Sequence, residues 1–212
     1  DGGNSHYFTI HDNSFKGMEC NNSDSGSIAD NTSYGEIKIA YCDHIVIDGN
    51  TITNGNMGIR LLSMNVNATI TSNTVTNNDW LGIYVSGSDH VVSNNIVNNN
   101  GGTSTASASP PYGGIIVEGA SNITLTGNTA NNNNQCGIYV SNQGHTVSGN
   151  TATGNTWLSG SYTFGGDLCG TIAPIYPPTV TVPSDITIAA STPSGMAVTY
   201  SGVTATDNIS VA

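Results

Sequence analysis

The side chains of this chain that could do acid–base chemistry are few, and their spacing limits what they could do. The cationic residues are Lys16, Lys38 and Arg60, beside 14 Asp and Glu residues. A polysaccharide lyase needs a basic side chain next to acidic ligands of a metal ion. Lys38 and Arg60 occupy equivalent places in GEIKI and MGIRL. We therefore expect them on neighbouring strands, as outward-facing residues without a convergent acidic cluster.

Paired carboxylates would support glycoside hydrolysis, which uses two of them about 5–9.5 Å apart. Asp43 and Asp48 are close in sequence, and Asp89 recurs near the station of Asp43 but two repeats away. The pattern does not favour an enzyme. The Asp-rich surface could hold calcium, but no segment has the alternating aspartates and glycine turn of a calcium loop. No cofactor is expected beyond that.

Three histidines, His44, His90 and His145, recur at one approximate station of the chain. If they lie about two repeats apart in a stack of strands, they are separated by roughly 10 Å. Ligands of one metal ion must converge on it at ~2.0–2.1 Å. We therefore expect these imidazoles to pack turns rather than to bind a metal.

The charge of the chain excludes several partners. Only 8% of the residues are charged, and the formal net charge is -11, whereas ordinary domains carry about 25% charged residues. Three cations cannot neutralise a run of phosphates. We therefore expect neither nucleic acid nor an anionic membrane surface as a partner. No segment has the roughly 18 apolar residues of a membrane span. Tyr84, Tyr112 and Tyr139 are the best candidates for a sparse sugar-binding aromatic stripe.

Cysteines and glycosylation sequons bear on the compartment. The four cysteines lack a CxxC spacing, and their even number fits two disulfides in an oxidising compartment, with buried free thiols as the alternative. We expect Cys20 to pair with Cys42 and Cys136 with Cys169. Possible N-glycosylation sites are Asn21, Asn31, Asn67, Asn122 and Asn208. They give weak support to a secreted or cell-surface location.

An internal repeat supplies the elements that would position these side chains. Segments such as HDNSF, DGNTIT and TSNTVT share a central asparagine, with successive spacings of 37, 23, 22, 33 and 22 residues. The predicted ladder asparagines are Asn13, Asn50, Asn73, Asn95, Asn128 and Asn150. Alternating β-branched segments before each asparagine, and glycine-led segments such as LGIYV after it, predict three short strands per unit.

Two architectures compete for this pattern of short strands. A sandwich of hairpins fits the strand spacing but gives no reason for asparagine at the same station six times. In a parallel β-helix each asparagine lies above the last, so the side-chain amides can hydrogen-bond in a ladder. The parallel β-helix is therefore the predicted fold.

The repeated motif, (I/V)-x-(S/T/D)-(G/N)-N-T-(I/V/A)-x-N followed by G-I-x-(V/L), resembles the right-handed parallel β-helix repeat proteins, the pectate-lyase-like superfold. The resemblance covers residues 4–155. It implies an all-β solenoid of about six coils over residues 1–155. It does not imply an activity, because this superfold hosts lyases, hydrolases, tailspikes and adhesins.

Two coils are longer than the others between the asparagine and glycine stations. The extra residues fall at 16–34 and 100–112, so we expect two loops that leave the solenoid at the same turn. Loops of this length either recognise a partner or are disordered insertions without a function.

The C-terminal residues depart from the repeat. Residues 156–172 are expected to cover the last coil, and 173–179 form a proline-rich linker. Residues 180–212 resemble the opening of a hyalin-repeat (HYR) module, which implies an incomplete immunoglobulin-like β segment. A whole module needs about 80–100 residues. We expect either a fragment of a longer protein or strands that complete their sheet with another molecule.

These features predict a secreted or cell-surface structural or adhesive β-helix. It would be a subunit of a surface layer or filament, with copies of itself as partners through its ends and tail strands, and possibly glycans. The alternative is a β-helix that binds or degrades carbohydrate as a lyase or hydrolase.

Overall fold

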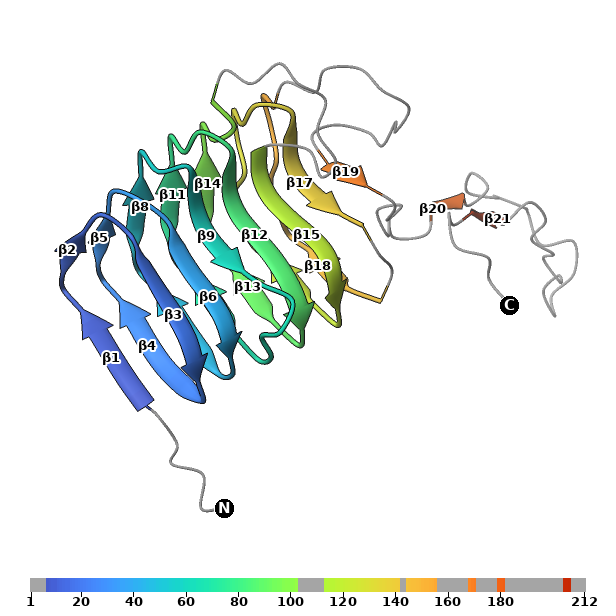
Figure 1. Cartoon of the computed structure of the whole chain (residues 1–212). Coiled ribbons are helices and arrows are strands. Elements are labelled where there is room, and N and C mark those ends of the chain that lie inside the picture. The colour runs from blue at the N-terminus through green and yellow to red at the C-terminus, as the bar shows by residue number, and fades with distance from the viewer. Residues whose placement is uncertain are drawn as a thin grey trace, which may run out of the picture. The chain divides into compact units, whose positions relative to one another are not determined.

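The computed structural model describes residues 7–102, 113–141 and 144–155, and the backbone of 168–170, 179–181 and 204–206. The chain divides into two compact units, Asp1–Ile172 and Ala173–Ala212. The first unit is a parallel β-solenoid of about six turns, in which three sheets run along the axis (Figure 1). None of the described residues forms a helix with the length and apolarity that a membrane crossing requires.

Each sheet takes one strand from each turn. Sheet A has the order β1 (Tyr7–His11), β4 (Ser25–Ala29), β7 (Ile45–Asp48), β10 (Thr69–Thr71), β13 (Val91–Ser93), β16 (Thr124–Thr126) and β18 (Thr146–Ser148). Sheet B has the order β2 (Ser14–Phe15), β5 (Thr32–Ser33), β8 (Thr51–Thr53), β11 (Thr74–Thr76) and β14 (Ile96–Asn98). Sheet C has the order β3 (Met18–Ser23), β6 (Ile37–Cys42), β9 (Met57–Leu61), β12 (Leu81–Ser88), β15 (Gly113–Ser121), β17 (Cys136–Val140) and β19 (Leu168–Gly170).

The core consists of aliphatic side chains stacked turn upon turn. Within sheet A, Ile28, Ile47, Ile70 and Val92 are register partners in succession, and all are fully buried. Burying one such side chain contributes about 1.5–3 kcal/mol. The alternation of buried and exposed residues along each strand follows from the period of two of a β-strand.

The predicted asparagine ladder is present in the turn between sheets A and B. Asn73 illustrates it: its Nδ2 donates to Oδ1 of Asn95 at 3.0 Å and to the carbonyl of Ile47 at 2.8 Å. The backbone N–H of Asn73 donates to the same Oδ1 at 2.9 Å. One carboxamide therefore satisfies donors and acceptors that the turn would otherwise bury without partners.

The prediction that residues 16–34 form a loop outside the solenoid is wrong. These residues form a complete turn of the solenoid, made of β3, β4 and β5. Asn31 is the ladder residue of this turn. Its Nδ2 donates to Oδ1 of Asn50 at 3.0 Å, and its Oδ1 accepts the backbone N–H of Asn13 at 2.9 Å. The second expected loop, 100–112, lies outside the described residues from 103 onward.

A second ladder occupies the turn between sheets B and C. Nδ2 of Asn78 donates to Oδ1 of Asn100 at 2.9 Å, and Nδ2 of Asn100 donates to Oδ1 of Asn133 at 3.0 Å. Asn133 continues to Asn155 at 3.1 Å. The strands β11 and β14 are thus flanked by ladder carboxamides at both ends.

The C-terminal expectations lie mostly outside the described residues. Of the expected cover at 156–172, β19 is described, and it adds a strand to sheet C beside β17. In the second unit, β20 (Thr179–Thr181) pairs antiparallel with β21 (Thr204–Thr206). The linker at 173–178 and the rest of 180–212 are not described, so the HYR-like module stays a prediction.

Replacing Asn73 by Ala should lower the free energy of unfolding by about 2–4 kcal/mol, because several buried backbone groups lose their partner. Asn56→Ala is the matched control, since Asn56 is exposed. Chemical denaturation of both variants measures the difference. Equal stability of the two variants would contradict a stabilising ladder.

Candidate functional site

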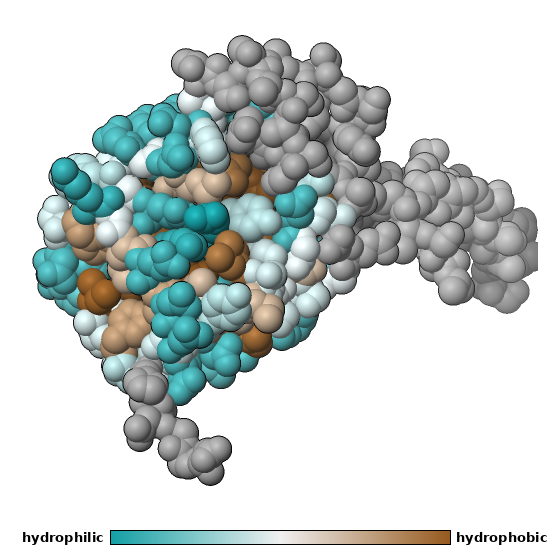
Figure 2. All heavy atoms as spheres, viewed as in Figure 1, coloured by the Kyte–Doolittle hydropathy of each residue, from teal (hydrophilic) through white to brown (hydrophobic). Residues whose placement is uncertain are grey.

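The outer face of sheet C carries two of the three cationic residues, and the third, Lys16, is exposed just before β3. Lys38 and Arg60 are register partners on β6 and β9, as expected. Nζ of Lys38 donates to Glu19 Oε1 at 2.8 Å, and the Arg60 guanidinium forms a two-pronged ion pair with Glu36. Lys38 and Arg60 are therefore each paired with a carboxylate rather than exposed as a free base. Figure 2 shows this face as a mosaic of hydrophilic and hydrophobic side chains.

Two of the three tyrosines proposed as an aromatic stripe share one column of this face. Tyr84 and Tyr139 are both register partners of Ile116, which lies between them. The Tyr84 hydroxyl donates to Glu118 Oε2 at 3.3 Å. Burial and the Glu118 carboxylate raise the pKa of Tyr84. Tyr112 lies outside the described residues.

The aspartates considered for glycoside hydrolysis lie in different columns. Asp48 is on the outer face of sheet A, opposite Thr71, whereas Asp43 bridges to Val66 at the end of sheet C. Asp89 lies in a turn and accepts a hydrogen bond from Asn122 Nδ2 at 2.6 Å, which lowers its pKa. Asp43, Asp48 and Asp89 therefore occupy separate positions on the solenoid.

A cluster of His11, Asp12 and Asp30 brings potential metal ligands together at the A–B turn. The His11 ring binds both carboxylates: Nδ1 lies 2.6 Å from Asp12 Oδ2, and Nε2 lies 3.0 Å from Asp30 Oδ2. All three residues are exposed. Both ring nitrogens of His11 thus already face a carboxylate oxygen, and calcium binding stays an untested expectation.

Two of the three histidines pack the turn between sheets C and A. His90 is fully buried; its Nδ1 accepts the Ala68 N–H at 2.9 Å, and its Nε2 lies 3.2 Å from the Ser86 carbonyl oxygen. His145 Nδ1 accepts the Ile123 N–H at 3.1 Å. Burial lowers the pKa of both imidazoles.

The third histidine was assigned to the wrong position in the repeat. Thr69 pairs with both Val46 and Val91, so His90 aligns with Ile45 rather than with His44. His44 is exposed, has a positive φ, and its Nε2 lies 3.5 Å from Asn67 Nδ2. The one-residue offset moves its ring out of the core.

The thiols of Cys20 and Cys42 meet in the interior. Their sulfur atoms lie 3.1 Å apart as free thiols, and burial, followed by contact with Cys42, raises the pKa of Cys20 to about 12. A bridge between them stays a prediction. Cys136 is disulfide-bonded, while the side chain of Cys169 lies outside the described residues.

The sequons differ in accessibility. Asn21, Asn67 and Asn122 are exposed, and Asn208 lies outside the described residues. Asn31 is 1% exposed, and its Nδ2 donates to the carbonyls of Ile10 and Ala29. A glycan at Asn31 is therefore incompatible with the folded solenoid.

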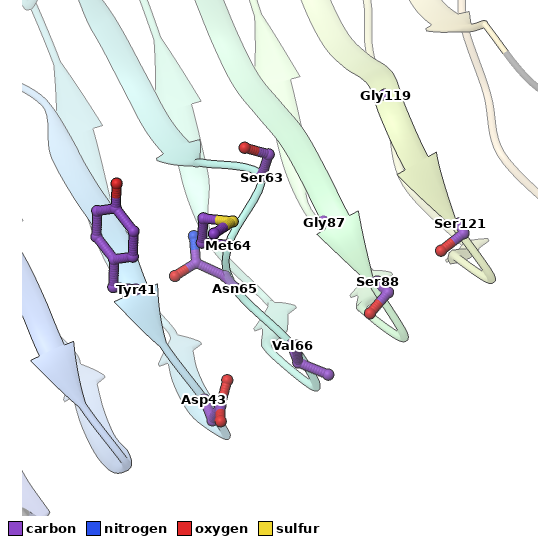
Figure 3. A pocket seen from close by; sticks show the side chains of 10 residues that line it. All are labelled: Tyr41, Asp43, Ser63, Met64, Asn65, Val66, Gly87, Ser88, Gly119 and Ser121. Atoms are coloured by element: carbon purple, nitrogen blue, oxygen red, sulfur yellow. The ribbon is translucent and has the colours of Figure 1, made fainter.

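A shallow depression of about 540 Å³ lies along the C-terminal edge of sheet C (Figure 3). Tyr41 and Met64 line it and are 56% and 62% exposed. Small residues of successive turns, Gly87 and Gly119 among them, form its floor. The segment from Ser63 to Val66 also lines the depression.

Sequence reasoning missed two columns on the outer face of sheet B. The first column contains Thr51, Thr74, Ile96, Thr129 and Thr151. The second contains Thr53, Thr76, Asn98, Asn131 and Thr153. The signal was present in the repeat itself, because Thr or Asn stands one and three residues after most ladder asparagines.

Three in-register parallel sheets with internal asparagine ladders define a β-helix protein. The family model described as "Right handed beta helix region" matches residues 2–112. The chain belongs to this right-handed β-helix family, and the predicted all-β, right-handed solenoid is confirmed. Comparison with the curated proteins and with the solved structures finds no match.

The depressed pKa values of His90 and His145 predict a pH-dependent stability. Unfolding restores the ordinary pKa near 6.5, so the unfolded chain binds more protons below that pH. The free energy of unfolding should therefore fall as the pH drops from 7 to about 5. Thermal melts across this range measure the effect, with the double variant H90Q/H145Q as comparison. An identical pH slope in that variant would contradict the assignment.

Proposed function

We propose that this protein is an extracellular structural or adhesive β-helix, a subunit of a cell-surface layer or filament built from copies of the chain. The observation that carries the proposal is the repetition of one contact from turn to turn. Each turn offers the next the same three strand edges and the same asparagine carboxamides in register. Such an edge is a template on which a strand of another copy can add.

Charge and chemistry support an extracellular setting. Two of the three cations, Lys38 and Arg60, are ion-paired, and the surplus of acidic groups gives a net charge of -11. The disulfide at Cys136 is typical of an oxidising compartment. The exposed sequons at Asn67 and Asn122 lie in different coils, at the corner that precedes a strand of sheet A. A glycan there would point away from the solenoid.

The second unit contributes to the proposed assembly through its strands. Residues 180–212 would form the incomplete HYR-like, immunoglobulin-like segment, and β20 with β21 is its described strand pair. A pair of strands alone is marginally stable in water. In our proposal the pair completes its sheet with strands of a neighbouring molecule.

Electron microscopy and sedimentation of the 212-residue chain test this assembly in physiological buffer. We expect concentration-dependent oligomers or fibres. A chain of residues 1–172 should assemble less if the tail strands contribute. Monodisperse monomers of the full chain at all concentrations would contradict the proposal.

A carbohydrate-binding role is the second candidate, and the column shared by Arg60, Tyr84 and Tyr139 favours it. Tyrosine rings can stack on sugar rings while their hydroxyls hydrogen-bond. If this column binds glycans, a glycan array should show hits that Tyr84→Ala weakens at unchanged stability. An array without hits, together with inactive lyase and hydrolase screens, would remove this candidate.

A further inference from the structure

The two columns of sheet B, which we call the threonine face, form a regular two-dimensional array. Within a strand the two outward residues are two positions apart, as in Thr51 and Thr53, and the residue between them, Ile52, is fully buried. Neighbouring strands follow at ~4.8 Å, and alternate residues of one strand at ~6.6–6.8 Å. The strands β8, β11 and β14 carry this array side by side (Figure 1).

The array is held rigidly. Every strand that contributes to it begins at a carboxamide of the first ladder, and most end at one of the second, such as Asn73 and Asn78 around β11. Threonine is β-branched, so its χ1 is restricted and its hydroxyl and methyl positions are fixed by the backbone. The array therefore does not have to be ordered when it meets a ligand.

The second column continues where threonine is replaced. Oδ1 of Asn98 accepts the Asn131 N–H at 2.8 Å, and Oδ1 of Asn131 accepts both the N–H and the hydroxyl of Thr153 at 2.9 and 3.0 Å. These carboxamides are thereby tied to the next turn. Their side chains therefore lie along the column, toward the next strand, and do not project from the face.

The threonine face also differs from the other two faces in charge. Neither of its columns contains an ionisable side chain from Thr51 to Thr153. The face ends there, because Tyr34 and Lys16 follow Ser33 and Phe15, the register partners that continue the column of Ile52. The outer face of sheet A carries His11 and Asp48, and that of sheet C carries Lys38 and Arg60. Among the described residues, the acidic groups lie outside the two columns. The partner complementary to such a face is electrically neutral and hydrogen-bonding.

We propose that the threonine face binds the surface of ice. The array repeats regularly in two directions, at ~4.8 Å between strands and ~6.6–6.8 Å along them, and the surface of an ice crystal is likewise a regular two-dimensional array of water oxygens. Each threonine hydroxyl offers one donor and two acceptor positions, which suits a lattice of water molecules. Its methyl group excludes disordered solvent between the hydroxyls. Neutral charge and rigid periodicity are both required, because a charged side chain imposes its own hydration on the first water layer.

This activity goes beyond the proposed assembly, since it needs one solenoid rather than a filament. Crystalline polysaccharide is the other periodic, neutral partner. It is disfavoured because neither column contains an aromatic side chain on which sugar rings could stack; the exposed Tyr34 lies one strand beyond Thr53, at the edge of the face.

Thermal hysteresis of the full chain is the test, measured as the gap between melting and freezing temperatures of a seed crystal. The full chain should open a gap, facet the crystal and, when fluorescently labelled, coat it. Thr74→Tyr and Thr51→Tyr, which place a bulky ring in the array, should each lose most of the hysteresis. Thr69→Tyr is the matched control, because Thr69 has the same environment on sheet A.

Circular dichroism and melting temperature establish that each variant is folded before its hysteresis is compared. Retention in Thr69→Tyr with loss in both face variants supports the proposal. No hysteresis in the folded full chain, undiminished hysteresis in both face variants, or an equal loss in the control would overturn it. Retention of the chain on crystalline cellulose or chitin without hysteresis would also overturn it. Assembly is measured separately in unfrozen buffer, so its failure leaves this result unaffected.

Discussion

The hydrogen-bonding capacity of the asparagine carboxamide is the constraint on which this solenoid depends. A chain that turns three times in about 22 residues must bury backbone N–H and carbonyl groups at each corner, where no strand pairs with them. Asn73 resolves this at one corner by receiving two donors from Asn50 and donating to two carbonyls. Each ladder residue is thereby tied to the turns on both sides, so the corner is as regular as the sheets. An apolar residue of similar size would fill the space but leave these groups unpaired.

The faces of the solenoid inherit their regularity from these corners. The sheet B strands β8, β11 and β14 are three residues long, and each presents its first and third side chains outward. The same arrangement accounts for the composition: Asn satisfies the corners, Thr and Ser occupy the outer columns, and Ile and Val fill the core. Charged residues have few positions left, and where they occur on sheet C they are paired, as Lys38 is with Glu19. The low charge content of this chain thus reflects how many corner and outer positions Asn, Thr and Ser occupy.

Much of the fold could be predicted because the ladder and the core recur in the sequence. The turn at residues 16–34 could not, because it is shorter than the others and its MECNNS strand lacks the Ile and Val of the glycine station. Asn31 was read as a glycosylation sequon, since a buried ladder asparagine followed by Thr and Ser has the same three letters. His44 was misplaced by one residue, and in a strand one residue reverses the side that faces the core. The threonines of the threonine face are part of the repeated motif, but that they form two columns follows only once the register of neighbouring turns is known.

Hydrogen–deuterium exchange of the corner amides tests the central role of the carboxamides most directly. The backbone N–H groups of Asn31, Asn50, Asn73 and Asn95 donate to the Oδ1 atom of the next ladder residue. Their exchange should be as slow as that of the strand interiors of sheet A, because opening a corner requires breaking the ladder. If these amides exchange at the rate of an unstructured peptide while the strand amides stay protected, the ladder does not hold the corners.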